Sequence, residues 1–393
     1  MDSGKIKDLV EKHFDAAVRI RRHLHMYPEA SLDEEKTAAL ISQTLTELGI
    51  PHQTGIAGHG IVGLIEGAKP GKTVLFRADM DALEMTEEAD VEYKSRIPGR
   101  MHACGHDGHV AGLLLAAMVL NELRGELTGN VKLMFQPAEE TVGGALPMIQ
   151  AGILENPKVD AAFGCHLWGS AEEGKVWVKS GPTMAAPDEF RIKVIGTGGH
   201  GALPHISIDP IVLAGEVVCA LQTVVARRIN PLDQAVITVG IIQGGTAFNI
   251  IPESVTIGGT IRTFDPETRD KIPKLMENLV AGITRGQGGD YELDVNRRYP
   301  ALINDPAMTA LAKASLAEIA GSENVEDMKE ANMGGEDFSY LLKEVPGSFF
   351  FVGISKDMQN PAMHHNPRFA WDEKALKVSA GGFCRIAFDY LAS

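Results

Sequence analysis

The chain has 393 residues, with 37 Lys and Arg against 52 Asp and Glu, which gives a formal net charge of −15. Such an acidic chain argues against a nucleic-acid-binding protein. At roughly 150 residues per domain the length predicts two or three domains, and 44% hydrophobic with 23% charged residues is an ordinary globular composition.

The first part of the chain alternates helices with strands. Apolar residues at three- and four-residue steps predict a helix from Ile6 to Tyr27, and a second helix runs from Glu34 to Leu48. The alternation that follows predicts an α/β sandwich with a largely parallel sheet. Its predicted elements are strands at Gly60–Ile65, Thr73–Arg77, Val131–Phe135 and Val159–Cys165, and helices at His106–Leu123 and Ala145–Ala151.

The element order changes after Asp188. Strands at Phe190–Ile195, Val236–Ile242, Val255–Ile261 and Tyr291–Val295, with helices at Pro210–Arg227 and Glu267–Ile283, give the order β-α-β-β-α-β of a ferredoxin-like domain. After Pro300 the first pattern resumes, with helices at Ala307–Ala320 and Glu373–Leu391 around a strand at Ser348–Val352. We expect one α/β domain, residues 1–184 and 299–393, interrupted by a satellite domain at 185–298. Ligand sites then belong at the carboxyl ends of the large domain's strands and in the cleft between domains.

The four cysteines have no paired spacing, which disfavours a disulfide framework and indicates a reducing compartment. The first ten residues lack the apolar stretch of a signal peptide, and no run of 18 apolar residues occurs. We therefore expect a cytoplasmic protein without a membrane partner.

One short segment concentrates metal-binding side chains. Residues 101–109, MHACGHDGH, hold a thiol, three imidazoles and a carboxylate at the start of a helix. Thiolate and imidazole together suit a borderline-soft divalent metal. The alternative is a buried cysteine beside surface histidines.

Further candidate ligands follow the strands of the same domain. Glu139 and Glu140 come after Val131–Phe135, His166 ends Val159–Cys165, and His364-His365 lies in the loop after Ser348–Val352. Taken singly, each is explained by a chance acidic pair or a structural histidine. Because all of them fall at strand ends or at a helix start of one domain, together they predict a metal site.

These segments resemble the M20 family of metallopeptidases and amidohydrolases, in its D-type branch. That branch contains N-acyl-L-amino acid amidohydrolases, hippurate hydrolases and auxin-conjugate hydrolases. The resemblance implies a zinc-peptidase-like α/β sandwich carrying a ferredoxin-like satellite that usually dimerises, so we expect a homodimer. The matching segments are 22–29, 77–83, 101–109, 136–140, 166–169, 198–205, 249–253, 335–339 and 365–369.

The resemblance implies two divalent metal ions, and it leaves open whether they are Zn, Mn, Co or Ni. The implied ligands are Cys104, His106, Glu140, His166 and His365, and Glu139 is the implied general base. His365 is chosen because the family's last ligand stands two residues before a proline, here Pro367, while His364 stays in reserve. The chain departs from the family pattern at two places. One is the doubled His364-His365, and the other is Glu84, where the family commonly has proline. Asp79 and Asp81 are candidates for supporting the ligands, and His25, His102 and His109 receive no catalytic role.

The satellite domain supplies further candidates. His200 lies on a Gly-rich turn and Asn249 precedes Ile250-Ile251-Pro252, and both could donate to an oxyanion, His200 even to that of a partner subunit. Arg262 ends a strand, where the family grips the substrate carboxylate. Gly335 is expected to shape the substrate pocket. The alternatives are a solvent-exposed turn histidine, a surface Arg paired with Glu, and a helix N-terminus with early acidic residues.

The predicted function is a metal-dependent amidohydrolase that cleaves the amide bond of an N-acyl amino acid or similar small conjugate. Glu139 would take a proton from water and pass it to the leaving amine. A carboxypeptidase or dipeptidase, or an amino-acid amidase, would use the same site. Outside this group, a metal-stabilised binding protein and a redox or nucleophilic Cys104 remain alternatives.

Overall fold

The computed structural model describes residues 1–361 and 363–393, and packing divides them into two compact units. The first unit contains Met1–Gly181, Ile303–Glu330 and Asp337–Ser393, and the second contains Pro182–Leu302 and Ala331–Glu336. Residues 331–336, which include Gly335, thus pack in the second unit, although the sequence analysis places them in the first domain. Each unit is described by itself.

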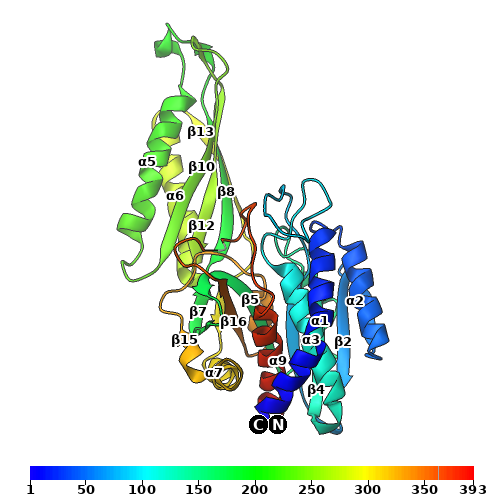
Figure 1. The fold of residues 1–393 in the computed structure, drawn as a ribbon. Coiled ribbons are helices and arrows are strands. Elements are labelled where there is room, and N and C mark those ends of the chain that lie inside the picture. Colours follow the sequence, from blue (N-terminus) through cyan, green and yellow to red (C-terminus); the bar gives the residue numbers. More distant parts are fainter. Residues whose placement is uncertain (362) are drawn as a thin grey trace. The chain divides into compact units, whose positions relative to one another are not determined.

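The first unit is built on one mixed sheet (Figure 1). Its strands are β1 (His52–Ile56), β2 (Gly60–Glu66), β3 (Lys69–Asp79), β4 (Thr128–Gln136), β5 (Ala161–Glu172), β6 (Val176–Val178), β15 (Val325–Asp327) and β16 (Gly347–Ser355). In the part of the chain that the structure describes, their order is β1-β2-β4-β3-β5-β16-β6-β15. The central strands β4, β3, β5 and β16 run parallel, whereas β1, β2 and β6 make antiparallel pairings.

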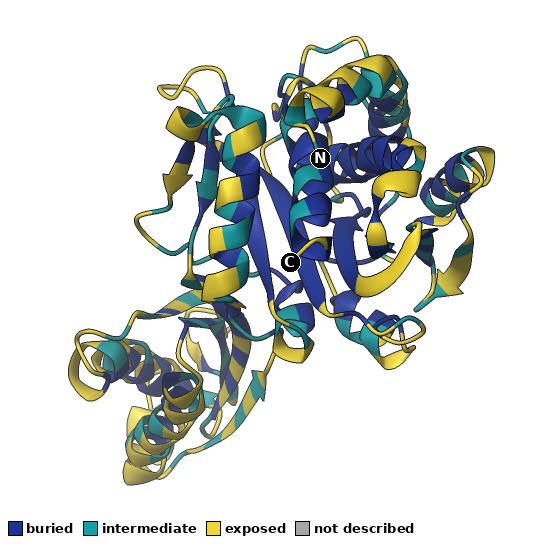
Figure 2. Cartoon of the chain, turned by 90° about the horizontal axis from the view of Figure 1, so that it is seen from below, coloured by how far each residue is buried: buried dark blue, intermediate teal, exposed yellow. Residues whose placement is uncertain are grey.

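Helices cover this sheet because their apolar stripes match its buried strands. They are α1 (Ser3–Met26), α2 (Glu35–Glu47), α3 (His106–Glu122), α4 (Ala145–Gln150), α7 (Pro306–Ala320), α8 (Ser339–Glu344) and α9 (Ala375–Leu391), with 3-10 turns at Arg124–Glu126 and Ser322–Asn324. α3 is buried on every side from His106 to Leu120, since it packs on β3 and also against α1 and α9. In Figure 2 the central strands are dark blue, while several outer helices carry yellow faces.

The strand register brings the candidate ligands to one edge of the sheet. Asp79 at the end of β3 pairs with Gln136 at the end of β4. On the other side β3 pairs with β5 up to Arg77 and Gly164, so that two residues further on Asp79 is level with His166. Asp79 at the end of β3, the loop after β4 with Glu139 and Glu140, and His166 therefore lie at one level of the sheet. His166 does not follow its strand as the sequence analysis expects, because β5 continues through it to Glu172.

The second unit holds a four-stranded antiparallel sheet in the order β10-β12-β8-β13. Its elements are β8 (Ala186–Ile195), β9 (Gly199–His200), the 3-10 turn Pro204–Ile206, α5 (Pro210–Arg228), β10 (Ala235–Gln243), β11 (Ile250–Ile251), β12 (Ser254–Thr263), α6 (Pro266–Gly286) and β13 (Asp290–Asn296). This is the predicted β-α-β-β-α-β order, with the sheet connectivity of a ferredoxin-like fold. The short strands β7 (Gly181–Met184) and β14 (Leu302–Asn304) lie where the chain passes between the units.

Three helices of this chain begin with the same pair of residues. α5, α6 and α7 each begin with an Asp-Pro pair, at 209–210, 265–266 and 305–306. The Asp side chain accepts a hydrogen bond from a backbone N–H of the first turn, and the Pro has no N–H that would need a partner. The local sequence therefore sets where these three helices begin.

α5 has the length and apolar composition of a membrane span, a property that core helices of globular proteins share. Its apolar stripe, Leu213, Val217, Leu221 and Val224, is buried in the core of the second unit together with Ile192, Ile257 and Met276.

The predicted α/β class is confirmed, but the sheet is less parallel than expected and has strands that the sequence did not indicate. β1, with the sequence HQTGI, is largely exposed at the sheet edge, and β6 and β15 have three residues each. A polar strand such as β1 carries no apolar alternation, and three residues are too few to show a period, so these strands could not be told from loops by pattern.

Candidate metal centre

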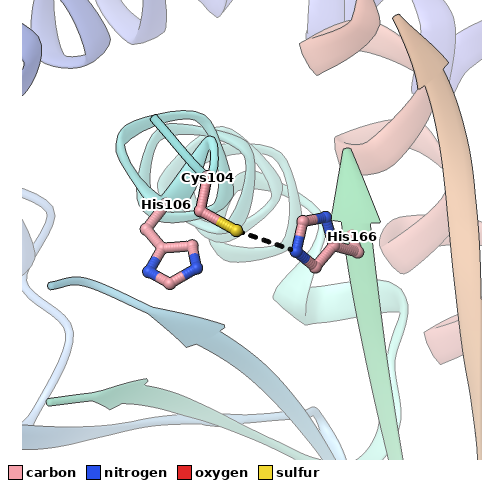
Figure 3. Close-up of side chains that lie close together, drawn as sticks. All are labelled: Cys104, His106 and His166. Carbon is pink, nitrogen blue, oxygen red and sulfur yellow. Dashed lines mark hydrogen bonds between the residues drawn. The ribbon is translucent and has the colours of Figure 1, made fainter. Parts of the chain in front are cut away.

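The segment 101–109 places its side chains as the sequence predicted. Cys104 precedes α3, Gly105 adopts a left-handed conformation (φ 90°), and His106 is the first residue of the helix. The Cys104 Sγ atom lies 3.5 Å from Nε2 of His166, which comes from β5 (Figure 3). Ligand atoms of Cys104, His106 and His166 all lie within 4.8 Å of one another.

Two further groups extend this cluster. Cys104, Glu140 and His365 bring ligand atoms within the same 4.8 Å, and so do His106, Glu139 and Glu140. Nε2 of His365 lies 3.2 Å from Oε1 of Glu140. The structure thus brings together all five residues predicted as metal ligands, with the predicted general base beside them.

Hydrogen bonds fix how the two buried imidazoles face the cluster. Nδ1 of His106 lies 2.9 Å from the Asp81 carbonyl oxygen and 3.1 Å from its Oδ1, while Nε2 has no hydrogen-bond partner although it is buried. Nδ1 of His166 donates to the carbonyl of Leu167 at 2.7 Å, which turns its Nε2 toward Cys104. A bare Nε2 with an anchored Nδ1 is the arrangement of a metal-binding histidine.

The electrostatics of the cluster favour a cation. Burial alone would lower the pKa of His106, but the carboxylates of Asp79, Asp81 and Glu140 raise it to about 10. Burial, Glu140 and Glu139 raise the pKa of the Cys104 thiol. The hydrogen bond to Glu140 also raises the pKa of His365. The cluster therefore retains protons, which neutralise part of its negative charge. Divalent ions would neutralise the same charge, and the donor set fits such ions.

Geometry distinguishes the two histidines of this pair. Nε2 of His364 lies 2.9 Å from the carbonyl oxygen of Leu167 and 3.3 Å from the backbone nitrogen of Gly169, and burial lowers the pKa of His364 to about 3. Only His365 of this pair joins a group of ligand atoms among the described residues. His365 adopts a left-handed backbone conformation (φ 56°), which is uncommon for a non-glycine residue and concentrates at functional sites.

The loop with Glu139 and Glu140 is held from two sides. The N–H of Glu140 donates to Oδ2 of Asp81 at 3.0 Å, and the N–H of Ala138 donates to Oε1 of Glu34 at 2.8 Å. Asp81 therefore positions both His106 and Glu140. Glu139 is buried, with 6% of its surface exposed.

Three residues for which the sequence analysis proposed no catalytic role form the support of this centre. His109 lies beside Asp79, with 2.5 Å between Nδ1 and Oδ1. Oδ2 of Asp107, the residue after His106, lies 2.9 Å from Nε of Arg21 and 2.8 Å from Nδ1 of His25. His102 is buried, and neither ring nitrogen has a hydrogen-bond partner. The sequence could have pointed to these residues, because they lie within the motif segments 22–29 and 101–109.

The remaining predicted residues belong to the second unit. His200 in β9 is paired with Ile250 in β11, and the N–H of Gly201 donates to the carbonyl of Asn249 at 2.8 Å, so His200 and Asn249 are neighbours. Both are exposed. Arg262 lies in β12, opposite Pro187 and Val236. A side chain at Gly335 would place its Cβ 2.5 Å from Pro187, so only glycine fits there. Their roles stay predictions.

The sequence profile of peptidase family M20/M25/M40 matches residues 75–389. The chain belongs to this family. The predicted family and the predicted class of enzyme, a metal-dependent amidohydrolase, are thereby confirmed.

Individual relatives of this M20 chain carry different names. The N-acyl-L-amino acid amidohydrolase of Geobacillus stearothermophilus is 44% identical over 77% of this chain and 82% of its own. Thermostable carboxypeptidase 1 of Saccharolobus solfataricus is 40% identical over 98% of both chains. The crystal structure of Bacillus subtilis YXEP, described as a dinuclear metal binding peptidase from the M20 family, has a TM-score of 0.84 at 33% identity and covers 98% of this chain and 99% of its own.

Proposed function

We propose that this M20 enzyme hydrolyses the amide bond of N-acyl amino acids or similar small conjugates and releases a carboxylic acid and an amino acid. The observation that carries the proposal is the convergence of a thiol, three imidazoles and two carboxylates at one sheet edge, with the Nε2 atom of His106 left bare.

Cys104, His106, Glu140, His166 and His365 would hold two divalent ions. When bound, such ions polarise an amide carbonyl and make water more acidic. Thiolate and imidazole donors suit zinc, cobalt and nickel, and carboxylates also accept manganese, so the donor set leaves these four open.

Glu139 is the proposed general base. Its carboxylate lies within 4.8 Å of ligand atoms of His106 and Glu140, whereas Oε1 of Glu140 faces His365 at 3.2 Å. The two neighbouring carboxylates therefore have different surroundings: Glu140 faces the predicted ligand His365, and Glu139 lies beside the same cluster. Glu139 accepts a proton from the attacking water and delivers it to the amine nitrogen as the C–N bond breaks.

The second unit supplies the proposed substrate contacts. His200 and Asn249, which are adjacent across β9 and β11, would donate to the oxyanion. Arg262 would bind the substrate's free carboxylate through its planar guanidinium group. Gly335 would shape the pocket through its backbone. The free carboxylate is the reason for preferring acylated amino acids over simple amides.

A carboxypeptidase is the second candidate, because a relative with that name is 40% identical over nearly the whole chain. A peptide with a free carboxyl terminus offers the same amide and the same carboxylate as an N-acyl amino acid. The two activities differ only in the group on the acyl side.

We further propose a cytoplasmic homodimer formed through the second unit. β10 is the edge strand of its sheet and exposes Ile241 and Ile242, which a second copy would cover. The free cysteines 104, 165, 219 and 384 are consistent with a reducing compartment. Light scattering of wild type and Ile242→Lys tests the dimer, and an unchanged mass for the variant would contradict this interface.

The decisive experiment is product release from a mixed panel of N-acetyl and N-benzoyl amino acids, dipeptides and amino-acid amides. Chelated enzyme is compared with enzyme reloaded with Zn, Mn, Co or Ni, and the products are identified by mass spectrometry. Metal-dependent release from acylated amino acids supports the proposal. Release from dipeptides alone favours the carboxypeptidase, and no release with any metal contradicts both.

A further inference from the structure

Three histidines contact the backbone of one residue beside the metal centre, Leu167. Its N–H, which belongs to the peptide bond with His166, donates to Nε2 of His109 at 3.0 Å. Its carbonyl, which belongs to the next peptide bond, accepts from Nδ1 of His166 at 2.7 Å and lies 2.9 Å from Nε2 of His364. The backbone of Leu167 therefore connects a residue without an assigned role, His109, to a predicted metal ligand, His166.

These contacts admit one tautomer of His109. Because Nε2 accepts from Leu167, Nδ1 must carry the proton, and it donates to Oδ1 of Asp79 at 2.5 Å. The other oxygen of Asp79 accepts from Nη1 of Arg77 at 2.6 Å, and Arg77 is itself held by Oε1 of Gln136 at 2.8 Å. A continuous hydrogen-bonded path thus runs from the ends of β3 and β4 to Leu167 in β5.

The same contacts argue against His109 as a metal ligand. Asp79, His106 and His109 have ligand atoms close enough to share an ion. Both ring nitrogens of His109, however, are engaged by protein groups, so no lone pair is left for a metal. Both oxygens of Asp79 are likewise hydrogen-bonded, to His109 and Arg77.

Tight packing keeps His109 in place. A Cβ atom added to Gly108 would lie 2.4 Å from Cδ1 of Leu167 and 2.5 Å from Cζ2 of Trp371. Glycine at 108 therefore lets the first turn of α3 approach β5 closely. This approach brings the His109 ring to 4.6 Å from the His166 ring, measured between centroids, in an edge-to-face arrangement.

We propose that His109, oriented by Asp79, is a positioning residue that fixes the backbone of Leu167 and through it the ring of His166, and thereby sets the affinity of the centre for metal. The inference rests on the metal centre proposed above. Groups that orient a metal-binding histidine through its second nitrogen typically contribute 10- to 100-fold in metal affinity. Here the carbonyl of Leu167 is that group, and His109 holds the N–H of the same residue.

Two substitutions separate the effects of the two hydrogen bonds that His109 makes, to Asp79 and to Leu167. Asparagine places its amide nitrogen near the position of Nδ1, so His109→Asn keeps the hydrogen bond to Asp79 and loses the acceptor for Leu167. Glutamine places its amide oxygen near the position of Nε2, so His109→Gln keeps the acceptor for Leu167. His109→Ala removes both. The Asn and Gln variants are polar and of comparable size, and they decide the question if the alanine variant does not fold.

The measurement is the dissociation constant for Co²⁺ and Zn²⁺ by competition with a chelator, on the full chain, together with the absorption spectrum of the Co²⁺ form. We expect about 10- to 100-fold weaker binding in His109→Ala and His109→Asn. We expect near-wild-type binding in His109→Gln, because the acceptor for Leu167 is restored. The melting temperature of the metal-free proteins serves as the control for folding.

Three results would overturn the inference. Unchanged affinity in His109→Asn, with or without a lower melting temperature, would make His109 a packing residue only. Complete loss of one equivalent of metal in every variant, with an altered Co²⁺ spectrum in His109→Gln, would make His109 a ligand. Absence of metal binding by the wild type would refute the proposed metal centre itself, and the inference with it.

Discussion

Replacing Arg21 by methionine should lower the free energy of unfolding of the first unit by about 4 kcal/mol at pH 7. Arg21 is fully buried, and its Nε lies 2.9 Å from Oδ2 of Asp107, the residue after the proposed ligand His106. Its guanidinium carbon also lies 4.3 Å from the ring centre of Tyr93 and 4.5 Å from that of Trp371. Without Arg21, the Asp107 carboxylate keeps His25 and His102 as the described neighbours that lower its pKa.

The magnitude follows from the geometry. At 2.9 Å the Coulomb energy is about 6 kcal/mol for an effective dielectric constant of about 20. The desolvation of Arg21 opposes this gain, and breaking buried ion pairs typically costs about 3–5 kcal/mol. Methionine retains part of the contact with the two aromatic rings, which keeps the expected loss near the middle of that range.

The effect should also depend on pH. Burial alone would raise the pKa of Asp107, but Arg21, followed by His25, lowers it well below its usual value. The stabilisation is therefore fully present above the pKa of an unfolded Asp, about 4, and is lost as the pH falls below it. The deficit of Arg21→Met relative to wild type should therefore stay nearly constant from pH 7 to about pH 4 and shrink below about pH 4.

Urea unfolding followed by tryptophan fluorescence is the assay, because Trp168, Trp177 and Trp371 all lie in the first unit. Lys5→Met is the matched control, because Lys5 lies on α1 as Arg21 does and pairs with Glu126 at an exposed position. It should cost less than about 1 kcal/mol in the free energy of unfolding. Asp107→Asn added to Arg21→Met should recover about half of the loss. A loss below about 1 kcal/mol in Arg21→Met, or no recovery in the double variant, would refute the reasoning.

Three other predictions concern the metal centre. Glu139→Gln should leave the metal content measured by mass spectrometry unchanged and lower kcat by about 100- to 10,000-fold, since it removes only the proton acceptor, and near-wild-type kcat would contradict its role as base. His365→Ala should lose one equivalent of metal whereas His364→Ala keeps both ions more weakly bound, and the reverse result would reassign the last ligand. Metal binding should strengthen as the pH rises from 6 to 8, because burial, Glu140 and Glu139 raise the pKa of Cys104 and a metal must displace its proton; affinity that is independent of pH in chelator competition would contradict a thiolate ligand.

The sequence alone determined the features that depend on neighbours along the chain. The Asp-Pro helix starts, the apolar stripe of α5 and the β-α-β-β-α-β order are set by local periodicity and capping, and they agree with the structure. The candidate ligands could be found because the ends of parallel strands meet at one edge of a sheet. Their chemistry and their position after strands were enough to group them.

Only the tertiary structure decided how those side chains face one another. The choice between His364 and His365 depends on the carbonyl of Leu167, which is nearly 200 residues away along the chain. The tautomers of His106 and His109 are set by Asp81 and Asp79 on β3 and the loop after it. The partner of Asp107, Arg21, comes from α1. Such contacts leave no periodic trace in a sequence, because a hydrogen bond between distant segments constrains one atom of each residue and not a repeating pattern of residues.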